Sequence, residues 1–278
     1  MKKNNRPGFW ERMAIVPHTV WVILFIAAPL LFVVYYAFTD KNGSFTLDNI
    51  ASLSFYGETF LMSISFSLIA TVVCLLIGYP LAYFMSKTKP KTQMALMLLI
   101  MLPMWVSLLI RTYSLMALLD NGGIVSTFLQ SLGFEKLTFI GTDAAVILGM
   151  IYDFLPYMVL PIFTSMTKID RSLCEAAMDL GCTPVRTFFR IEVPAVMPGI
   201  VSGLILGFTL SLDDFVISHF VSSPDFMTLP LYIYNQTAHD VKFSMYALCT
   251  IIIIVILALL MIINFIGPNR KKKKAVAK

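Results

Sequence analysis

The chain has 278 residues and a formal net charge of +5, and 58% of its side chains are hydrophobic while only 13% are charged. A soluble globular domain carries about 25% charged residues, so this composition excludes an ordinary water-soluble protein and predicts a lipid environment. Four scattered cysteines show no metal-ligand spacing, and we interpret them as reduced, structural thiols.

Six apolar stretches are long enough to cross a bilayer, for which a helix needs about 20 apolar residues. In chain order, we expect membrane spans at approximately 14–38, 60–85, 94–119, 143–165, 195–221 and 243–267. The first stretch is too long for a cleavable signal peptide. The sequence therefore predicts an all-α integral membrane protein with six transmembrane helices.

Basic residues are distributed unevenly between the two sides of these predicted spans. If the N-terminus lies in the cytoplasm, 17 of the 21 Lys and Arg residues fall on the cytoplasmic side. We therefore expect an N-terminal tail at 1–13, a membrane domain at 14–267 with a cytoplasmic loop at 166–194, and a basic tail at 268–278. The basic tail is expected to contact anionic lipid, and we predict no binding to nucleic acid.

The cytoplasmic loop contains a polar stretch with two predicted amphipathic helices. The first helix has an apolar face at i, i+3, i+4 and i+7, formed by Leu173, Ala176, Ala177 and Leu180. Gly181 is expected to end it, because glycine adopts the left-handed conformation at low cost.

Thr183 and Pro184 predict the cap and first residue of the second helix, which we expect to end at Pro194. A DNA-binding helix-turn-helix is disfavoured because the unit is tethered to membrane at both ends. The small residues Ala176 and Ala177 would bury little area in lipid, so they favour the close approach of another protein.

This loop resembles the cytoplasmic loop of ABC importer permeases, and the similarity extends over residues ~60–265. In that family the loop forms coupling helices that dock into a groove on the ATP-hydrolysing subunit. Carried over residue by residue, the match covers Glu175, Ala176, Ala177, Gly181, Ile191 and Pro194.

Two further stretches resemble spermidine/putrescine permeases. Residues 107–113 are similar to one of the two permease paralogues of that system, whereas 208–218, Pro224 and 229–234 are more similar to the other. The paralogue therefore stays open. The resemblance implies a polyamine permease of the bacterial inner membrane with three kinds of partner: a second permease, ABC ATPase subunits and an extracytoplasmic binding protein. It implies alternating access driven by movement of the loop.

The chain itself is predicted to be neither an enzyme nor a binder of cofactors, because it has no G-x-x-x-x-G-K-[ST] phosphate-binding motif. ATP and Mg²⁺ would be bound by the partner ATPase.

Three carboxylates fall within predicted spans, where a charge costs about 2.5–3.5 kcal/mol on insertion scales and normally faces a cavity or a partner. Asp153 lies near the middle of the fourth span, and Asp213 and Asp214 lie in the outer part of the fifth. Adjacent residues on a helix point about 100° apart, so we expect only one of Asp213 and Asp214 to face a pathway. Arg111, in the third span, is a possible internal counter-ion.

Aromatic residues supply a second element of a cation pathway, because the faces of their rings attract ammonium groups. Trp105, Tyr113 and Tyr152 are the candidates, although packing or lipid contact also explains aromatics in membrane spans. These side chains and the three aspartates favour a cationic cargo.

Three other functions remain to be weighed against polyamine import. A permease of the same family could carry a metal cation, thiamine or another solute, although the intramembrane acids disfavour an anion. A membrane enzyme could bind metal at Asp213 and Asp214, but no His or Cys stands beside them at helical spacing. A secondary transporter would normally show internal repeats, and we find no convincing one.

Overall fold

The computed structural model describes residues 9–40, 43–51, 56–133, 138–223, 226–237 and 242–266. These residues contain helices and no β-strand, apart from an isolated bridge between Thr39 and Phe45. The predicted all-α class is confirmed for this part of the chain. The basic tail at 268–278, residues 1–8 of the N-terminal tail and Pro224 lie outside the described residues.

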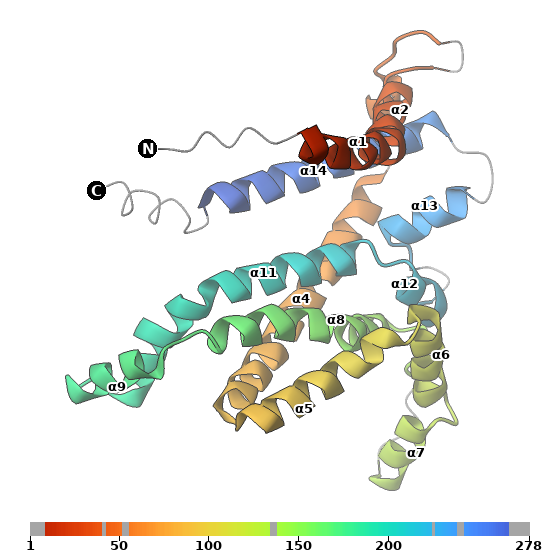
Figure 1. The fold of residues 1–278 in the computed structure, drawn as a ribbon. Coiled ribbons are helices and arrows are strands. Elements are labelled where there is room, and N and C mark those ends of the chain that lie inside the picture. The colour runs from red at the N-terminus through yellow and green to blue at the C-terminus, as the bar shows by residue number, and fades with distance from the viewer. Residues whose placement is uncertain are drawn as a thin grey trace. The chain divides into compact units, whose positions relative to one another are not determined.

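The helices form two units that are compact in themselves, and their labels are shown in Figure 1. The first unit contains α1 (Phe9–Val22), a π-helical turn η1 (Ile23–Ala27), α2 (Ala28–Ala37), α3 (Asp48–Ala51) and α14 (Phe243–Ile266). Within it α2 packs on α14, where the ring of Tyr36 lies 5.3 Å from Tyr246 and 6.0 Å from Phe243.

The second unit contains the remaining helices. In order they are α4 (Gly57–Lys87), α5 (Pro90–Met101), η3 (Leu102–Trp105), α6 (Leu108–Leu119), α7 (Ile124–Ser131), α8 (Asp143–Met166), α9 (Arg171–Asp179), α10 (Pro184–Thr187), η4 (Phe188–Glu192), α11 (Val193–Leu212), α12 (Val216–Val221) and α13 (Leu229–Thr237).

Four helices of the described chain are long and apolar enough to cross a membrane, at 16–37, 57–87, 143–166 and 184–212. A bent pair at 90–105 and 108–128 makes a fifth span if the two parts are counted together, and α14 adds a shorter apolar stretch at 243–258. Four of the six predicted spans, the first, second, fourth and sixth, coincide closely with single helices or helix series of the structure.

The third predicted span, 94–119, is wrong as one straight helix. Its two halves meet at an angle of 96°. The helix tightens into a 3₁₀ turn at Pro103, and Val106 and Ser107 then adopt ψ values of 140° and 137°. Two consecutive extended residues cannot continue a helix, so α6 starts in a new direction at Leu108.

The fifth predicted span, 195–221, is also wrong in its bounds. Its helix begins at Pro184 and ends at Leu212, and a short separate helix, α12, follows. The break falls at 213–215, where the carboxylate of Asp214 accepts hydrogen bonds of 3.4 Å from the backbone N–H groups of Ile217 and Ser218 in α12. A carboxylate at this position satisfies the N–H groups of a new helix better than it continues the old one.

Pro194 does not end the second amphipathic helix as predicted, because α10, η4 and α11 form one continuous helix. Proline lacks an N–H and clashes with the carbonyl four residues earlier, which normally breaks a helix. Here the turn before it is widened to a π-helix, in which the N–H of Val193 donates to Phe188, five residues back. The widened turn accommodates the proline within the helix.

The core of the second unit is built on close contact between α8 and α11, the most extensive pairing of helices in the described chain. Gly199, Gly203 and Gly207 recur every four residues on the buried face of α11. A Cβ on Gly199 would lie only 2.5 Å from the carbonyl oxygen of Pro161, and one on Gly203 would lie 2.8 Å from the sulfur of Met158. Only glycine permits this approach, as in small-residue interfaces of membrane helices.

Candidate functional site

The polar loop folds as a helix, a glycine turn and a second helix. Asp170 caps α9 by accepting a 3.0 Å hydrogen bond from the Ser172 N–H, and this bond holds the pKa of the Asp170 carboxyl below its usual value. Gly181 ends the helix with φ +88°, and Thr183 accepts from the Arg186 N–H at the start of α10. The local geometry therefore follows the turn and capping residues as expected.

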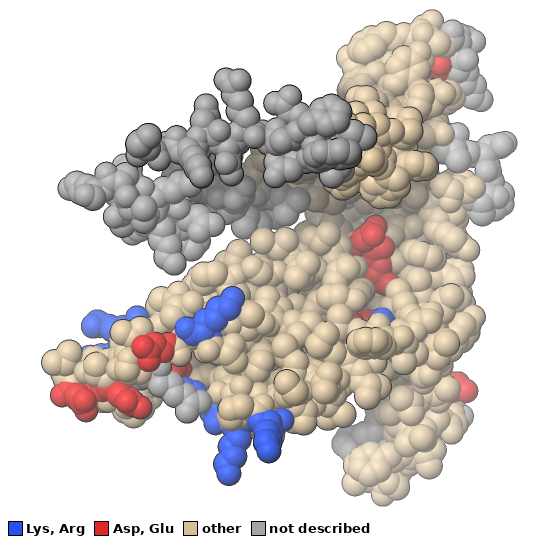
Figure 2. Space-filling model, viewed as in Figure 1, with Lys and Arg blue, Asp and Glu red and all other residues tan. Residues whose placement is uncertain are grey.

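This loop exposes apolar side chains on its surface. Leu173 is 58% exposed, Leu180 88% and Val185 67%. Of the six residues carried over from the family motif, Glu175, Ala176, Gly181 and Pro194 are exposed, Ile191 is half-buried, and Ala177 is buried. Figure 2 shows acidic and basic side chains gathered at this end of the second unit. Exposed apolar side chains therefore lie among charged residues on this loop.

A buried ion pair joins α6 to α8. Nη1 of Arg111 lies 2.7 Å from Oδ1 of Asp153, and the two side chains are 9% and 0% exposed. Within the described residues, Oδ2 of Asp153 and Nε of Arg111 have no hydrogen-bond partner. Arg111 of the bent third segment therefore pairs with Asp153 of the fourth predicted span. It pairs with neither Asp213 nor Asp214 in the described structure.

The two neighbouring aspartates of the fifth segment have different environments. Asp214 is 6% exposed and accepts from the backbone of α12, whereas Asp213, at the end of α11, is exposed. Asp213 is therefore the carboxylate of this pair that a ligand could reach. In the described part of the chain, no three His, Cys, Asp or Glu side chains come together in a way that could hold a metal ion.

The three predicted aromatic residues do not converge on a common buried site. Trp105 is 86% exposed at the bend after η3, Tyr113 packs its ring 4.9 Å from Phe220, and Tyr152 is exposed on α8. Their exposure leaves them available to lipid, to a partner chain or to a shared pathway.

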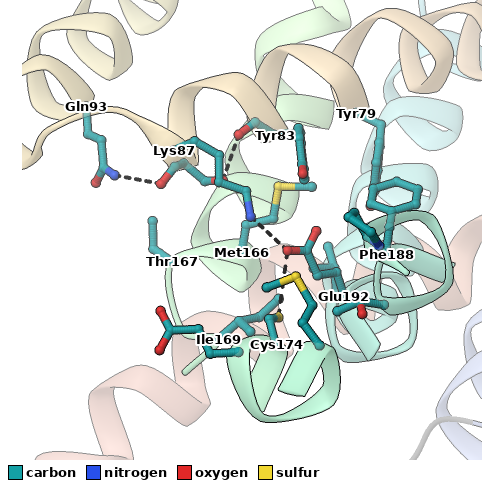
Figure 3. Close-up of a pocket in the computed structure, with 16 residues that line it drawn as sticks. Tyr79, Tyr83, Lys87, Gln93, Met166, Thr167, Ile169, Cys174, Phe188 and Glu192 are labelled. Carbon is teal, nitrogen blue, oxygen red and sulfur yellow. Dashed lines mark hydrogen bonds and ion pairs between the residues drawn. The ribbon is translucent and has the colours of Figure 1, made fainter. Parts of the chain in front are cut away.

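A second ion pair, which the sequence analysis missed, lies in a cavity of about 410 Å³ near α9. Nζ of Lys87, at the end of α4, lies 2.7 Å from Oε1 of Glu192 in η4 and 4.8 Å from the centre of the Tyr83 ring. The thiol of Cys174 approaches the same carboxylate oxygen at 3.7 Å, and Figure 3 shows Lys87 and Cys174 both pointing toward it. Burial and the nearby carboxylate raise the pKa of this thiol.

The sequence contains a sign of the helix packing in this unit but none of the second ion pair. The four-residue repeat of Gly199, Gly203 and Gly207 is a direct sign of close helix packing. Lys87 and Glu192 each stand at the polar end of an apolar stretch, although their separation of 105 residues gives no sign that they pair.

The long apolar helices, together with the broken third segment and the exposed loop at 166–194, are typical of an integral membrane protein. Residues 75–272 match the family model described as the binding-protein-dependent transport system inner membrane component, and the chain belongs to this family. It is thus a permease component of an ABC transporter located in the inner membrane.

The chain is similar to named permease proteins, in two of the three cases below over most of its length. It is 37% identical over 219 residues to the spermidine/putrescine transport system permease protein PotB of Salmonella typhimurium, which covers 75% of this chain and 76% of the relative. The PotB protein of Escherichia coli K12 is 38% identical over 208 residues, covering 71% and 76%. The putrescine transport system permease protein PotI of the same strain is 46% identical over 97 residues, covering 35% and 34%.

Solved structures support the same fold. A bacterial ABC transporter involved in the import of the acidic polysaccharide alginate aligns with a TM-score of 0.73 at 21% identity, covering 92% of this chain and 94% of that chain. The alginate transporter in complex with a pentasaccharide-bound periplasmic protein aligns with a TM-score of 0.72 at 19% identity, covering 95% and 96%.

Proposed function

We propose that the chain is one permease subunit of an ATP-driven importer of polyamines. The observation that carries the proposal is the identity of 37–39% to PotB permeases over two thirds or more of the chain. A cationic cargo also suits the exposed carboxylate of Asp213 at the end of α11.

The proposed subunit crosses the membrane six times with both termini in the cytoplasm. The bent pair α5–η3 and α6 supplies one span and α14 the last. The bias of Lys and Arg residues supports this orientation. A second permease shares the pathway, and a binding protein delivers cargo from outside.

The loop at 166–194 is the proposed docking site of the ATPase, which binds ATP and Mg²⁺. The exposed Leu173, Leu180 and Val185 form the contact surface, and Gly181 sets the angle between the two helices. Because α9 follows α8 directly while α10 continues into α11, movement of the loop acts on both helices of the glycine-packed pair. The coupling is therefore mechanical, through a semi-rigid pair of helices that alternates access to the pathway.

The proposed pathway residues are Asp213, Trp105, Tyr113 and Tyr152, and the Arg111–Asp153 pair is proposed to hold α6 against α8 beside them. Arg111 neutralises the charge of Asp153, so we assign a positioning role to Asp153. Contact with the cargo is assigned to Asp213. Asp214 is proposed to hold the turn that presents Asp213, because its carboxylate accepts from two backbone N–H groups of α12.

Uptake of labelled spermidine and putrescine by the complete transporter in proteoliposomes tests the cargo. We expect Asp213→Asn to lower uptake by about tenfold, since a lost charged contact is worth about 1.5–3 kcal/mol or less when partly exposed. Asp143→Asn, an exposed acid in the first turn of α8, is the matched control and should leave uptake unchanged. Absence of polyamine uptake by the unaltered transporter would refute the proposed cargo.

Co-purification with the ATPase tests the docking surface separately. Leu180→Glu places a charge on the most exposed leucine of the loop and should abolish co-purification. Leu132→Glu changes another exposed leucine, which follows α7, and should leave co-purification intact. Equal recovery of the ATPase with both variants would count against docking at this loop.

A further inference from the structure

The cavity beside α9 has the composition of a ligand site, although it already contains a lysine. Its volume of about 410 Å³ falls in the range of small-molecule pockets, about 300–1,000 Å³. Its wall combines two acidic residues, Glu192 and Glu175, with the rings of Tyr79, Tyr83 and Phe188, and Glu192 is the one paired with the lysine. The rings of Tyr79 and Tyr83 lie edge to face with Phe188 at 6.0 Å and 5.6 Å, which fixes the aromatic wall (Figure 3).

The contacts of Lys87 indicate which chemical group this cavity can bind. The Lys87 ammonium is 2.7 Å from the Glu192 carboxylate and 4.8 Å from the centre of the Tyr83 ring. A carboxylate together with the face of a tyrosine ring is a recognised site for an alkylammonium group, and contact within about 6 Å of the ring centre is attractive. Lys87 is a primary alkylammonium tethered to α4.

The two members of the pair differ in how firmly they are held. The side chain of Glu192 is 13% exposed, whereas that of Lys87 is 46% exposed. A half-exposed lysine has a long flexible stem and can leave with little change elsewhere, because exposed ion pairs contribute only about 0–1 kcal/mol. The carboxylate would stay behind in a site that favours a cation.

Two hydroxyl groups in the same wall have unused hydrogen-bonding capacity. Thr187 is 4% exposed, and within the described residues neither its Oγ1 nor the hydroxyl of Tyr79 has a hydrogen-bond partner. A primary ammonium has three N–H donors, and hydroxyl oxygens can accept from those that the carboxylate does not use. Buried hydroxyl groups normally have a hydrogen-bond partner, so these two unpaired hydroxyls indicate a polar ligand.

We propose that this cavity is a second binding site, distinct from the transport pathway, for free primary alkylammonium compounds, and that Lys87 occupies it as a displaceable tethered competitor. The site lies at the end of the bundle that bears α9, which is the cytoplasmic end in the proposed orientation. If the proposed cargo is correct, the ligand is imported polyamine, and its binding beside the docking loop reports the internal concentration to the coupling helices. The regulatory role of polyamine rests on the proposed function, whereas binding of a simple amine to the cavity does not.

Calorimetric titration of the complete transporter in lipid nanodiscs, without the binding protein, tests the site with butylamine and putrescine. Lys87→Met removes the tethered competitor and keeps the length of the stem, so it should bind butylamine about tenfold more tightly than the unaltered transporter. Lys91→Met, another exposed lysine that does not line the cavity, is the matched control and should not change affinity. Equal affinity of Lys87→Met and Lys91→Met for butylamine would overturn the proposal.

The acid and the ring are tested in the Lys87→Met background. Adding Glu192→Gln should abolish butylamine binding, and adding Tyr83→Leu, which keeps the carboxylate, should weaken it several-fold. Thermal unfolding gives a second measurement: butylamine should raise the Tm of Lys87→Met more than that of the unaltered transporter, and 1-butanol should not. A Tm unaffected by butylamine, or raised equally by the neutral alcohol, would show that the pair is structural only.

The two proposals can fail separately. Polyamine uptake without butylamine binding to Lys87→Met refutes the cavity and leaves the cargo intact. Butylamine binding without polyamine uptake refutes the cargo and leaves the alkylammonium site.

Discussion

Two ion pairs of the second unit have the same length and different surroundings. Arg111–Asp153 and Lys87–Glu192 both measure 2.7 Å. The first is almost completely buried between α6 and α8, whereas the lysine of the second is half exposed at the end of α4. Distance alone therefore does not tell how strongly a pair is held, because the cost of separating charges depends on how much water can replace the partner.

The difference divides the unit into a fixed region and an exchangeable region. In the fixed region, glycines of α11 contact α8 from Met158 to Ser165, and the side chains of Arg111 and Asp153 are only 9% and 0% exposed. Around Glu192, the cavity and the exposed lysine leave room for another cation. The proposed coupling uses both kinds of region, since rigid helices would transmit the movement that an exposed loop receives.

The largest effect is expected from breaking the buried pair. Arg111→Met leaves the Asp153 carboxylate without its cation at 0% exposure, and such losses cost about 3–5 kcal/mol. We expect a large fall in folded protein after detergent extraction, measured by size-exclusion chromatography and thermal unfolding.

The double variant Arg111→Met/Asp153→Leu removes both charges and is the control. It should recover most of the lost stability, because apolar side chains of similar volume often replace a buried pair without cost. A double variant as unstable as Arg111→Met would show that the effect came from packing.

Part of this pair was predictable from sequence. A single arginine inside an apolar stretch has to find an internal acid, so Arg111 was a candidate counter-ion. The choice among Asp153, Asp213 and Asp214 was not predictable, because it depends on the bend at Val106 and Ser107 that points α6 toward α8.

Two further differences have separate physical causes: hydrophobicity locates a span but not its breaks, and a proline indicates a helix end that a widened turn can remove. Asp214 falls inside a predicted continuous helix, whereas in the structure it lies in the break between α11 and α12 and accepts from the Ile217 N–H. Pro194 predicts a helix end, but in the structure a π-helical turn before it accommodates the proline within a continuous helix. Local signals of known geometry were more reliable: Gly181 and Thr183 act as the expected helix end and helix cap.

A smaller effect is expected at the glycine-packed interface that fixes the first region. The Cβ of Gly199→Ala would fall 2.5 Å from the backbone oxygen of Pro161 and 2.3 Å from the Ser165 hydroxyl, so α8 and α11 must separate. Overpacking of this kind costs about 1–3 kcal/mol. Thermal unfolding of the complex should show a lower Tm, and uptake should fall with it if the two helices move as one body.

Gly57→Ala is the matched control, because nothing lies within 4 Å of the added methyl group and the residue is also helical. A Tm of Gly199→Ala equal to that of Gly57→Ala would contradict the close packing.

A substitution in the turn between α9 and α10 would test how the loop beside the exchangeable region is positioned. Gly181 has φ +88°, and a side chain there costs about 1–2 kcal/mol even though nothing lies within 4 Å of it. Gly181→Ala should therefore loosen the end of α9, seen as faster hydrogen exchange in residues 176–182, and weaken co-purification with the ATPase without changing the Tm of the membrane helices.

Gly122→Ala, at a turn glycine that is equally uncrowded and has no positive φ, should change neither quantity. If exchange in α9 were the same in both variants, backbone conformation would not be what positions the loop.

The smallest effect is expected at the other end of α9, where Asp170 caps the helix. The Ser172 hydrogen bond lowers the pKa of Asp170, so the folded protein binds this proton less readily than the unfolded chain. The contribution of the cap is therefore complete above the usual pKa of about 3.9 and is lost as pH falls through the lowered value.

Asp170→Ala should speed hydrogen exchange in α9 at pH 7 by less than Gly181→Ala does, whereas Asp170→Asn, which still caps, should stay close to the unaltered chain. Partial proteolysis within 171–180 by an acid-tolerant protease, at pH 7 and at about pH 2, checks the sign: the difference between Asp170→Ala and the unaltered chain should shrink at the lower pH, which lies below the usual carboxyl pKa. A difference that grew as the carboxyl gained its proton would mean that α9 is held by contacts other than its cap.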